Sequence, residues 1–322
     1  MHGWLIVDKP VGPGSTRVVG AVKRALREGC YPKVKVGHGG TLDPLASGVL
    51  PVALGEATKL SGRMLDSDKA YDFTIRFGEE TDTLDAEGKA VARSDVRPTL
   101  AEVEAVLERF TGMIEQVPPV YSALKVEGKR AYDLARAGKA PKMKARRVTV
   151  GQVSIRHSSE SWNPSFSGDG PKRKGDSSFR WNDGVEEITL SAEVSKGTYI
   201  RSLARDIARA LGTVGHVVML RRTRAGPFTL DRAIPLDKLA ELGHARQLEQ
   251  ALLPLAAGLD DIPALPVTPD QARLLRQGRT LAGIAAKPGL HLATEGSVPV
   301  ALVELSGDGL RPELKVVRGF NL

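Results

Sequence analysis

The chain has 322 residues, of which 41 % are hydrophobic and 26 % are charged, which suits about two domains with apolar cores. It has no apolar run near the roughly 18 residues of a membrane span. Residues 1–10 lack the basic start and the longer apolar region of a signal peptide, so none is expected. The single cysteine, Cys30, excludes an internal disulfide and a cysteine-rich metal site and fits a reducing cytoplasm. The net charge of +8 and the isoelectric point near 9.6 favour a polyanionic partner, most commonly a nucleic acid.

Basic residues gather in two places. The first group is Arg136, Lys139, Lys142, Lys144, Arg146 and Arg147, and the second is Arg221, Arg222 and Arg224. Either group alone is typical of a solvated, solubilising face. Together, in a chain this basic, they indicate phosphate contacts. Charge does not distinguish RNA from DNA.

The first informative segment in chain order is the glycine-rich stretch 37–48, which carries one carboxylate, Asp43. Pro44 disfavours the α region at Asp43 and predicts an extended or turn conformation there. The glycines allow close approach of another backbone, and Leu42 and Leu45 can keep the surroundings of the carboxylate dry. The pattern indicates a carboxylate presented for chemistry, and the alternative is an aspartate that only caps a turn.

The next segment predicts strands and a helix. Residues 71–77 alternate between apolar and polar positions and predict a strand, for which residues 89–92 are the expected partner. Thr99 and Glu102 have the spacing of a capping box and predict the start of a helix that runs to Phe110. Gly112 is its expected stop.

Two further strands are expected at 148–155 and 187–194. The residues between them, 157–184, are rich in Ser, Gly, Asn, Asp and basic residues and predict a flexible surface insertion. Its aromatic residues allow an RNA-stacking role, although a loop without function is the simpler interpretation. A helix carrying Leu203 and Ile207 is expected after the second strand.

The prolines at 263, 266 and 269 mark a domain boundary after a helical stretch at 236–255. Beyond it we expect a short helix at 270–277. Strands at 298–305 and 310–317 form a predicted hairpin. These patterns predict domains at 1–262 and 263–322, the second of them a small β-barrel-like module.

Six blocks of sequence resemble, in the same order, those of a known family. They are 8–12 (DKPVG), 37–50 (GHGGTLDPLASGVL), 68–71 (DKAY), 118–125 (PPVYSALK), 197–201 (GTYIR) and 220–228 (LRRTRAGPF). They resemble the TruB-type tRNA pseudouridine synthases from about Leu5 to Ile234, and the C-terminal tail is similar to the PUA module of these enzymes. The chain departs from the family pattern at 12–15 and in the insertion at 157–184.

The resemblance implies an α+β fold, with a mixed, mainly antiparallel sheet in the catalytic body and a small β-barrel-like PUA domain that binds RNA. It implies an isomerase that converts uridine 55 in the T-loop of tRNA to pseudouridine on a flipped-out nucleotide. The reaction transfers no electrons, so no cofactor is expected. The expected partner is the T stem-loop of tRNA, with no membrane and no obligate protein partner.

Pseudouridine formation breaks a C–N glycosidic bond, turns the uracil and rejoins it through C5. It needs an ionised carboxylate and a dry pocket that holds the freed base. The resemblance makes Asp43 the nucleophile. Arg201 is the candidate cation that keeps Asp43 ionised, against the alternative of a structural ion pair with an acid such as Asp206.

Other site residues follow from the same resemblance. Tyr71 is expected to stack on the uracil and to help move the C5 proton, although a core tyrosine would fit its strand equally well. Tyr199 and Leu220 are similar to residues that wall the base pocket. His38 is expected to contact RNA where the target nucleotide leaves its stack, and it has no companions that would make a metal site.

Lys9 and Lys69 are expected to support structure or to contact phosphate. Phosphate-binding candidates are Lys125, Arg146 and Arg147. Two rival interpretations stay open: an RNA-binding or tRNA-chaperone protein without essential catalysis, and the guide-RNA-dependent branch of the same family, whose catalytic subunit needs partner proteins.

Overall fold

The computed structural model describes residues 1–126, 128–139, 141–156, 184–306 and 312–322. Contacts divide the chain into unit 1, formed by Met1–Ser67 and Arg224–Leu322, and unit 2, formed by Asp68–Thr223. The insertion expected at 157–184 lies outside the described residues except for Gly184. Within the described part of the chain, no helix is long and apolar enough to cross a membrane.

Unit 1 holds both ends of the chain. Its strands are β1 (Gly3–Lys9), β2 (Val36–His38), β3 (Ser47–Leu54), β13 (Phe228–Thr229), β14 (Ile234–Pro235), β15 (Ala264–Pro266), β16 (Leu281–Ala282), β17 (Gly289–Glu295), β18 (Val298–Ser306) and β19 (Glu313–Gly319). Its α-helices are α1 (Ser15–Glu28), α2 (Ser61–Asp66), α6 (Lys238–His244) and α7 (Pro269–Arg276), and its 3₁₀ helices are η1 (Gly55–Leu60), η3 (Leu230–Arg232) and η4 (Leu255–Gly258).

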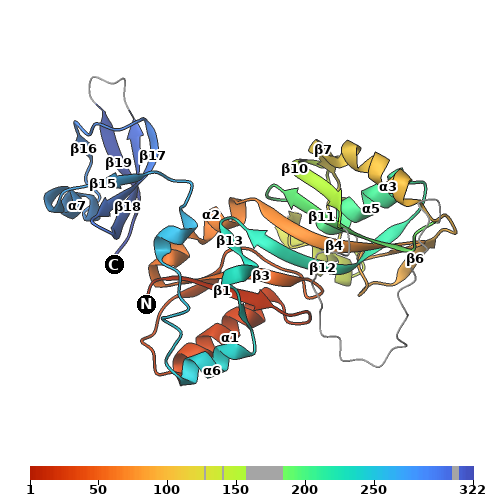
Figure 1. Ribbon diagram of the computed structural model, residues 1–322, viewed down its shortest axis with the longest axis horizontal. Helices are drawn as coiled ribbons and strands as arrows, with labels where there is room; N and C mark the ends of the chain where they lie inside the picture. The colour runs from red at the N-terminus through yellow and green to blue at the C-terminus, as the bar shows by residue number, and fades with distance from the viewer. Residues whose placement is uncertain (127, 140, 157–183, 307–311) are drawn as a thin grey trace. The chain divides into compact units, whose positions relative to one another are not determined.

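Strands β1 and β3 form the centre of the N-terminal part of unit 1. They pair antiparallel from Gly3 opposite Leu54 to Lys9 opposite Gly48, with β14 parallel on the other side of β1. Nearly every residue of both strands is buried, so their apolar runs are covered on both faces. Helices α1 and α6 lie side by side near β1 (Figure 1).

The C-terminal part of unit 1 is a five-stranded sheet in the order β15-β17-β18-β19-β16, with α7 beside it (Figure 1). A capping box between Thr268 and Gln271 starts α7, as expected for a helix at 270–277. The strands of the predicted hairpin pair antiparallel. Its turn residues 307–309, and the expected start of its second strand, lie outside the described residues; the described part of that strand begins at Glu313.

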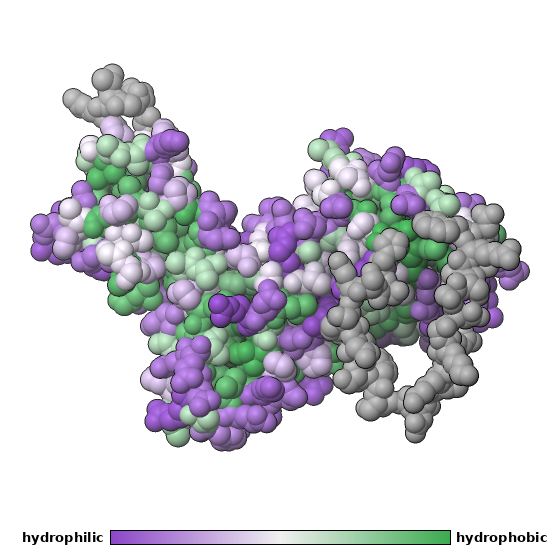
Figure 2. All heavy atoms as spheres, in the orientation of Figure 1, coloured by the Kyte–Doolittle hydropathy of each residue, from purple (hydrophilic) through white to green (hydrophobic). Residues whose placement is uncertain are grey.

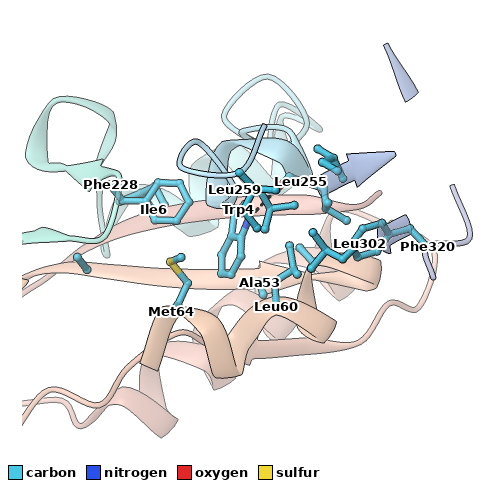
Figure 3. Close-up of a cluster of buried hydrophobic side chains, with 14 of the residues drawn as sticks. Trp4, Ile6, Ala53, Leu60, Met64, Phe228, Leu255, Leu259, Leu302 and Phe320 are labelled. Atoms are coloured by element: carbon cyan, nitrogen blue, oxygen red, sulfur yellow. Dashed lines mark hydrogen bonds between the residues drawn. The ribbon is translucent and has the colours of Figure 1, made fainter. Parts of the chain in front are cut away.

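A core around Trp4 joins these two parts of unit 1 (Figure 3). The Trp4 side chain is fully buried, its Nε1 atom donates to the Leu255 carbonyl at 3.2 Å, and its ring lies 5.3 Å from that of Phe228. Leu302 and Phe320 belong to the same core. The first strand and the last residues of the chain therefore share one apolar cluster.

Unit 2 is a continuous stretch of chain. Its strands are β4 (Lys69–Phe77), β5 (Glu79–Thr81), β6 (Ala90–Arg93), β7 (Gly112–Gln116), β8 (Lys125–Val126), β9 (Lys129–Arg130), β10 (Arg146–Ile155), β11 (Glu187–Val194) and β12 (Gly215–Ala225), of which the last two residues belong to unit 1. Its helices are α3 (Leu100–Leu107), η2 (Glu108–Phe110), α4 (Ala131–Arg136) and α5 (Ile200–Ala210).

The sheet of unit 2 has the order β12-β4-β11-β10-β7. The strands expected at 71–77, 148–155 and 187–194 are confirmed, and β4, β11, β10 and β7 pair antiparallel in turn. Helix α3 begins with the expected capping box between Thr99 and Glu102. The mixed, mainly antiparallel sheets and the separate five-stranded sheet confirm the α+β class.

Two expectations about single elements were wrong. Strand β6 pairs with β5 rather than with the strand at 71–77, because the chain turns at Gly78 (φ +95°) and places β5 before it. The helix expected over 236–255 is confined to Lys238–His244, because Arg246 adopts a left-handed conformation (φ +56°) that ends it.

Candidate active site

The loop that carries Asp43 lies between β2 and β3 and is fastened to the start of α1. The Ser15 hydroxyl accepts a hydrogen bond from the Leu42 N–H at 2.8 Å and donates one to the Leu42 carbonyl at 3.2 Å. Leu42 is buried, as the sequence suggested, and Asp43 is half-buried beside it. The residue before Asp43 is thus tied to the start of α1.

Pro44, the residue after Asp43, is held by the N-terminal strand and the turn that follows it. The Gly12 N–H donates to the Pro44 carbonyl at 2.8 Å. The ammonium of Lys9 reaches the same carbonyl at 3.4 Å and the Pro10 and Pro13 carbonyls at 2.9 Å. Lys9 is fully buried, which favours the structural role considered for it over a phosphate contact.

His38 ends β2 and lies opposite Val52 of β3. It is half-buried, and its Nδ1 accepts a hydrogen bond from the Gly40 N–H at 3.4 Å. A Cβ added to Gly39 would lie 2.7 Å from the Cβ of Met64, so α2 makes the close approach that this glycine permits. No group of three potential metal ligands exists among the described residues.

Tyr71 lies near the start of β4 opposite Ala192 of β11, and it is half-buried. Phe73 and Ile75, which alternate with it on the strand, are fully buried. The neighbouring Asp72 forms an ion pair with Arg156 and accepts a hydrogen bond from Ser191. The end of the strand carrying Tyr71 is therefore well fixed.

Arg201 lies in the first turn of α5, and its guanidinium binds three residues of the same unit. Its Nη1 lies 3.1 Å from the Asp85 carboxylate and donates to the Thr83 carbonyl at 2.8 Å, while its Nη2 donates to the Tyr121 carbonyl at 3.0 Å. The side chains of both ion-pair partners are about 95 % buried, with 6 % and 5 % exposed. Asp206, the structural partner considered for Arg201, pairs with Arg205 instead.

Asp85 is the site residue that the sequence analysis missed. One of its carboxylate oxygens accepts hydrogen bonds from the Thr83 hydroxyl at 2.6 Å and the Glu87 N–H at 3.1 Å. The segment around Asp85 reads as an ordinary polar turn in the sequence. Its burial follows from a bridge between Asp85 and Val217 of β12, a contact between distant residues that no local pattern signals.

Tyr199 precedes α5, and its N–H donates to the side chain of Gln116 at 2.8 Å. Leu220 lies on β12, with 6 % of its surface exposed. In the same strand Arg222 is 1 % exposed, so it does not belong to a phosphate-binding surface as the basic group 221–224 suggested.

Hydrophilic residues cover much of the face shown in Figure 2.

The remaining basic candidates lie in unit 2. Lys125 is exposed on β8, opposite Arg130 of β9. Arg146 and Arg147 are exposed at the start of β10, and Arg147 lies 3.7 Å from the Glu115 carboxylate. Lys69 is buried at the start of β4. Of the site candidates, Lys9, His38 and Asp43 belong to unit 1 and the others to unit 2.

Comparison with protein families gives the affiliation of the chain. Residues 27–200 match the TruB family pseudouridylate synthase (N terminal domain), and residues 201–260 match the tRNA pseudouridylate synthase B C-terminal domain. The chain belongs to the TruB family. Relatives named tRNA pseudouridine synthase B include one from Novosphingobium aromaticivorans, 60 % identical with 100 % of this chain and 98 % of the relative covered. Another, from Zymomonas mobilis, is 56 % identical with coverage of 100 % and 96 %.

Solved structures share the fold. A chain of an H/ACA RNP bound to a substrate RNA containing 2'-deoxyuridine superposes with a TM-score of 0.69 at 23 % identity, covering 99 % of this chain and 85 % of that chain. A chain of a Cbf5–Nop10–Gar1 complex superposes with a TM-score of 0.65 at 26 % identity, covering 94 % and 78 %. The chain therefore shares its fold with chains solved within larger complexes.

Proposed function

We propose that the chain is a tRNA pseudouridine synthase that isomerises uridine 55 of the T-loop, with Asp43 as the nucleophile. Membership of the TruB family and full-length relatives named tRNA pseudouridine synthase B support this activity. The observation that carries the role of Asp43 is the fastening of its loop through Ser15, Gly12 and Lys9. Rigid support of this kind suits a group that must meet its substrate in one geometry.

In the proposed reaction the C1'–N1 bond of uridine breaks, the uracil turns within the pocket, and a C1'–C5 bond forms. The C5 proton leaves and N1 takes up a proton, so the product has the same composition as the substrate. We assign to Asp43 the attack that accompanies cleavage of the C1'–N1 bond, and the bond that Asp43 forms breaks again before the product leaves. We assign to Arg201 the role of cationic partner of that carboxylate. Tyr71 stacks on the base and assists proton movement at C5, and Tyr199 and Leu220 wall the pocket.

We propose that the substrate presents its T stem-loop with the target nucleotide flipped out, and that His38 contacts the RNA where the base leaves its stack. Lys125, Arg146 and Arg147 are exposed and suit phosphate contacts. The five-stranded module beyond residue 262 adds RNA contacts as a PUA-like domain. The protein acts without an obligate protein partner and works in the cytoplasm, where tRNA is modified.

The deciding experiment measures tritium release from tRNA labelled at C5 of uracil. Asp43→Asn keeps the size of the side chain and removes the charge, so release should fall by at least about 10³-fold while tRNA affinity stays within about threefold. Asp95→Asn is the matched control, because Asp95 is an exposed aspartate in a loop of unit 2. Release by Asp43→Asn at the wild-type rate would contradict the assignment.

The same assay separates the rival functions. The wild-type protein alone should form pseudouridine in bare tRNA, and mapping of the product should locate it at position 55. Tight tRNA binding without turnover would instead favour an RNA-binding or chaperone protein. Turnover that appears only after a guide RNA and partner proteins are added would favour the guide-dependent branch.

A further inference from the structure

A short segment of unit 2, residues 116–121, binds Tyr199 and the first two turns of α5, which carry Arg201. The Gln116 side chain accepts from the Tyr199 N–H at 2.8 Å, and the Tyr121 carbonyl accepts from Arg201 at 3.0 Å. Between them, the Val117 carbonyl accepts from Ser202 at 2.9 Å and from Arg205 at 3.0 Å. Four hydrogen bonds thus connect this segment to the first two turns of the helix.

Gln116 is the member of this segment that acts through its side chain. It is the last residue of β7, and only 2 % of its surface is exposed. The Tyr199 N–H that it binds belongs to the residue that precedes the helix. The Tyr199 carbonyl accepts the Leu203 N–H at 3.0 Å, so both polar groups of the Tyr199 backbone are fixed.

The other end of the same amide makes a poor contribution to stability. The Nε2 atom of Gln116 is buried and has no hydrogen-bond partner among the described residues. An unpaired buried donor destabilises a fold, since it has lost its bonds to water. A general gain in stability therefore does not explain a glutamine at this position, whereas its hold on Tyr199 does.

We propose that Gln116 is a positioning residue for pseudouridine formation: through Tyr199 it sets the wall of the base pocket and the helix turn that carries Arg201. The inference rests on the proposed function, because it concerns residues assigned to that site. Gln116 does not touch the reacting atoms. It acts on the rate of the chemical step by fixing the geometry of residues that do.

The test compares two substitutions of nearly the same size. Gln116→Met keeps the length and flexibility of the side chain and removes the acceptor. Gln116→Glu keeps an acceptor oxygen, and a carboxylate next to the N-terminus of a helix is favourable. We expect the single-turnover rate at saturating enzyme to fall about 10- to 100-fold in Gln116→Met. In Gln116→Glu it should stay within about threefold of wild type, and tRNA affinity should stay within about twofold in both variants.

Thr189→Val is the control for stability. It removes the hydrogen bond of 2.9 Å between the hydroxyls of Thr189 and Thr74, within the sheet of the same unit. Its single-turnover rate should match wild type even where its thermal midpoint is lowered. All rates are measured below the unfolding transitions recorded by circular dichroism.

The outcomes decide the proposal. A wild-type rate in Gln116→Met, an equal loss in Gln116→Glu, or a matching loss in Thr189→Val would overturn it. A Gln116→Met protein without a folded structure would assign Gln116 to stability and also overturn it. A wild-type protein that forms no pseudouridine would contradict the proposed function itself. The proposal for Gln116 is judged only from the rates of the variants relative to an active wild-type protein.

Discussion

Arg201 and Lys9 are buried cations whose charges face oxygen atoms of the protein. Lys9 donates to three backbone carbonyls around the Asp43 loop, whereas Arg201 binds one carboxylate and two carbonyls at the start of α5. Burial of such groups is unfavourable unless their donors are satisfied. Both cations therefore hold the backbone around the candidate site in place through their hydrogen bonds.

Asp85→Asn tests the contribution of the ion pair between Asp85 and Arg201 to stability and activity. Removing the carboxylate takes away an ion-pair partner 3.1 Å from a buried guanidinium, and we expect the free energy of unfolding to fall by about 3 kcal/mol. We also expect the rate of pseudouridine formation to fall more than about tenfold at temperatures where the variant is folded, because Arg201 loses a contact that orients it. Urea unfolding and single-turnover assays measure the two effects.

Asp206→Asn is the matched control for this prediction. Asp206 pairs with Arg205 on the same helix, but 27 % of its side chain is exposed. The pair is worth no more than about 1 kcal/mol. A loss of stability in Asp206→Asn as large as that in Asp85→Asn would show that burial of the Arg201 pair has no special effect.

At the scale of elements, the sequence predicted those helices and strands that depend on contacts between residues close together in the chain. The capping boxes at Thr99 and Thr268 start α3 and α7 because the cap and its partner are three residues apart in the chain. Period-two alternation predicted strand β4. The partner of β6, by contrast, depends on the short strand β5, whose three residues are too few to show a period.

The same limit applies to the candidate site. The motif around Asp43 is visible in the sequence because its glycines, proline and aspartate are neighbours. The role of Asp85 depends on an ion pair with Arg201, and that of Gln116 on a hydrogen bond from Tyr199, both of them partners far away in the chain. Such residues are identified only when the fold brings their partners together.

The capping box of α3 predicts a pH dependence of stability. Hydrogen bonds from the backbone N–H and the hydroxyl of Thr99 lower the pKa of Glu102 from its ordinary value of 4.5. The contribution is fully present above pH 4.5 and is lost as the pH falls through the lower pKa of the folded state. The urea midpoint of wild type should therefore exceed that of Glu102→Gln at pH 7, and the difference should shrink at pH 3.

Glu104→Gln serves as the control, because Glu104 is exposed on the same helix but lies outside the capping box. Its midpoint should follow that of wild type at both pH values. A difference between wild type and Glu102→Gln that grows on acidification would contradict the predicted sign.

At the scale of the whole molecule, β10 and β11 are antiparallel neighbours that a short turn could connect, but the chain between them is long. Ile155 lies opposite Leu190, and the Arg156 N–H donates to the Thr189 carbonyl at 2.9 Å. Replacing 157–184 with a short turn should leave the strands paired and the turnover of tRNA within about twofold of wild type. A large loss of turnover with an unchanged thermal midpoint would show that the insertion has a function.

Because synthesis runs from the N-terminus to the C-terminus, the core around Trp4 can be completed only late in synthesis. Unit 2 is one continuous stretch and has all of its residues once synthesis passes residue 223. Unit 1 consists of two stretches of chain, one before and one after unit 2. The indole of Trp4 therefore packs against Leu302 and Phe320 only after the ribosome has synthesised those residues. Strand β1 thus completes its packing only after residues 302–320 have been synthesised, about 300 residues later in the chain, and its apolar surface stays partly uncovered until then.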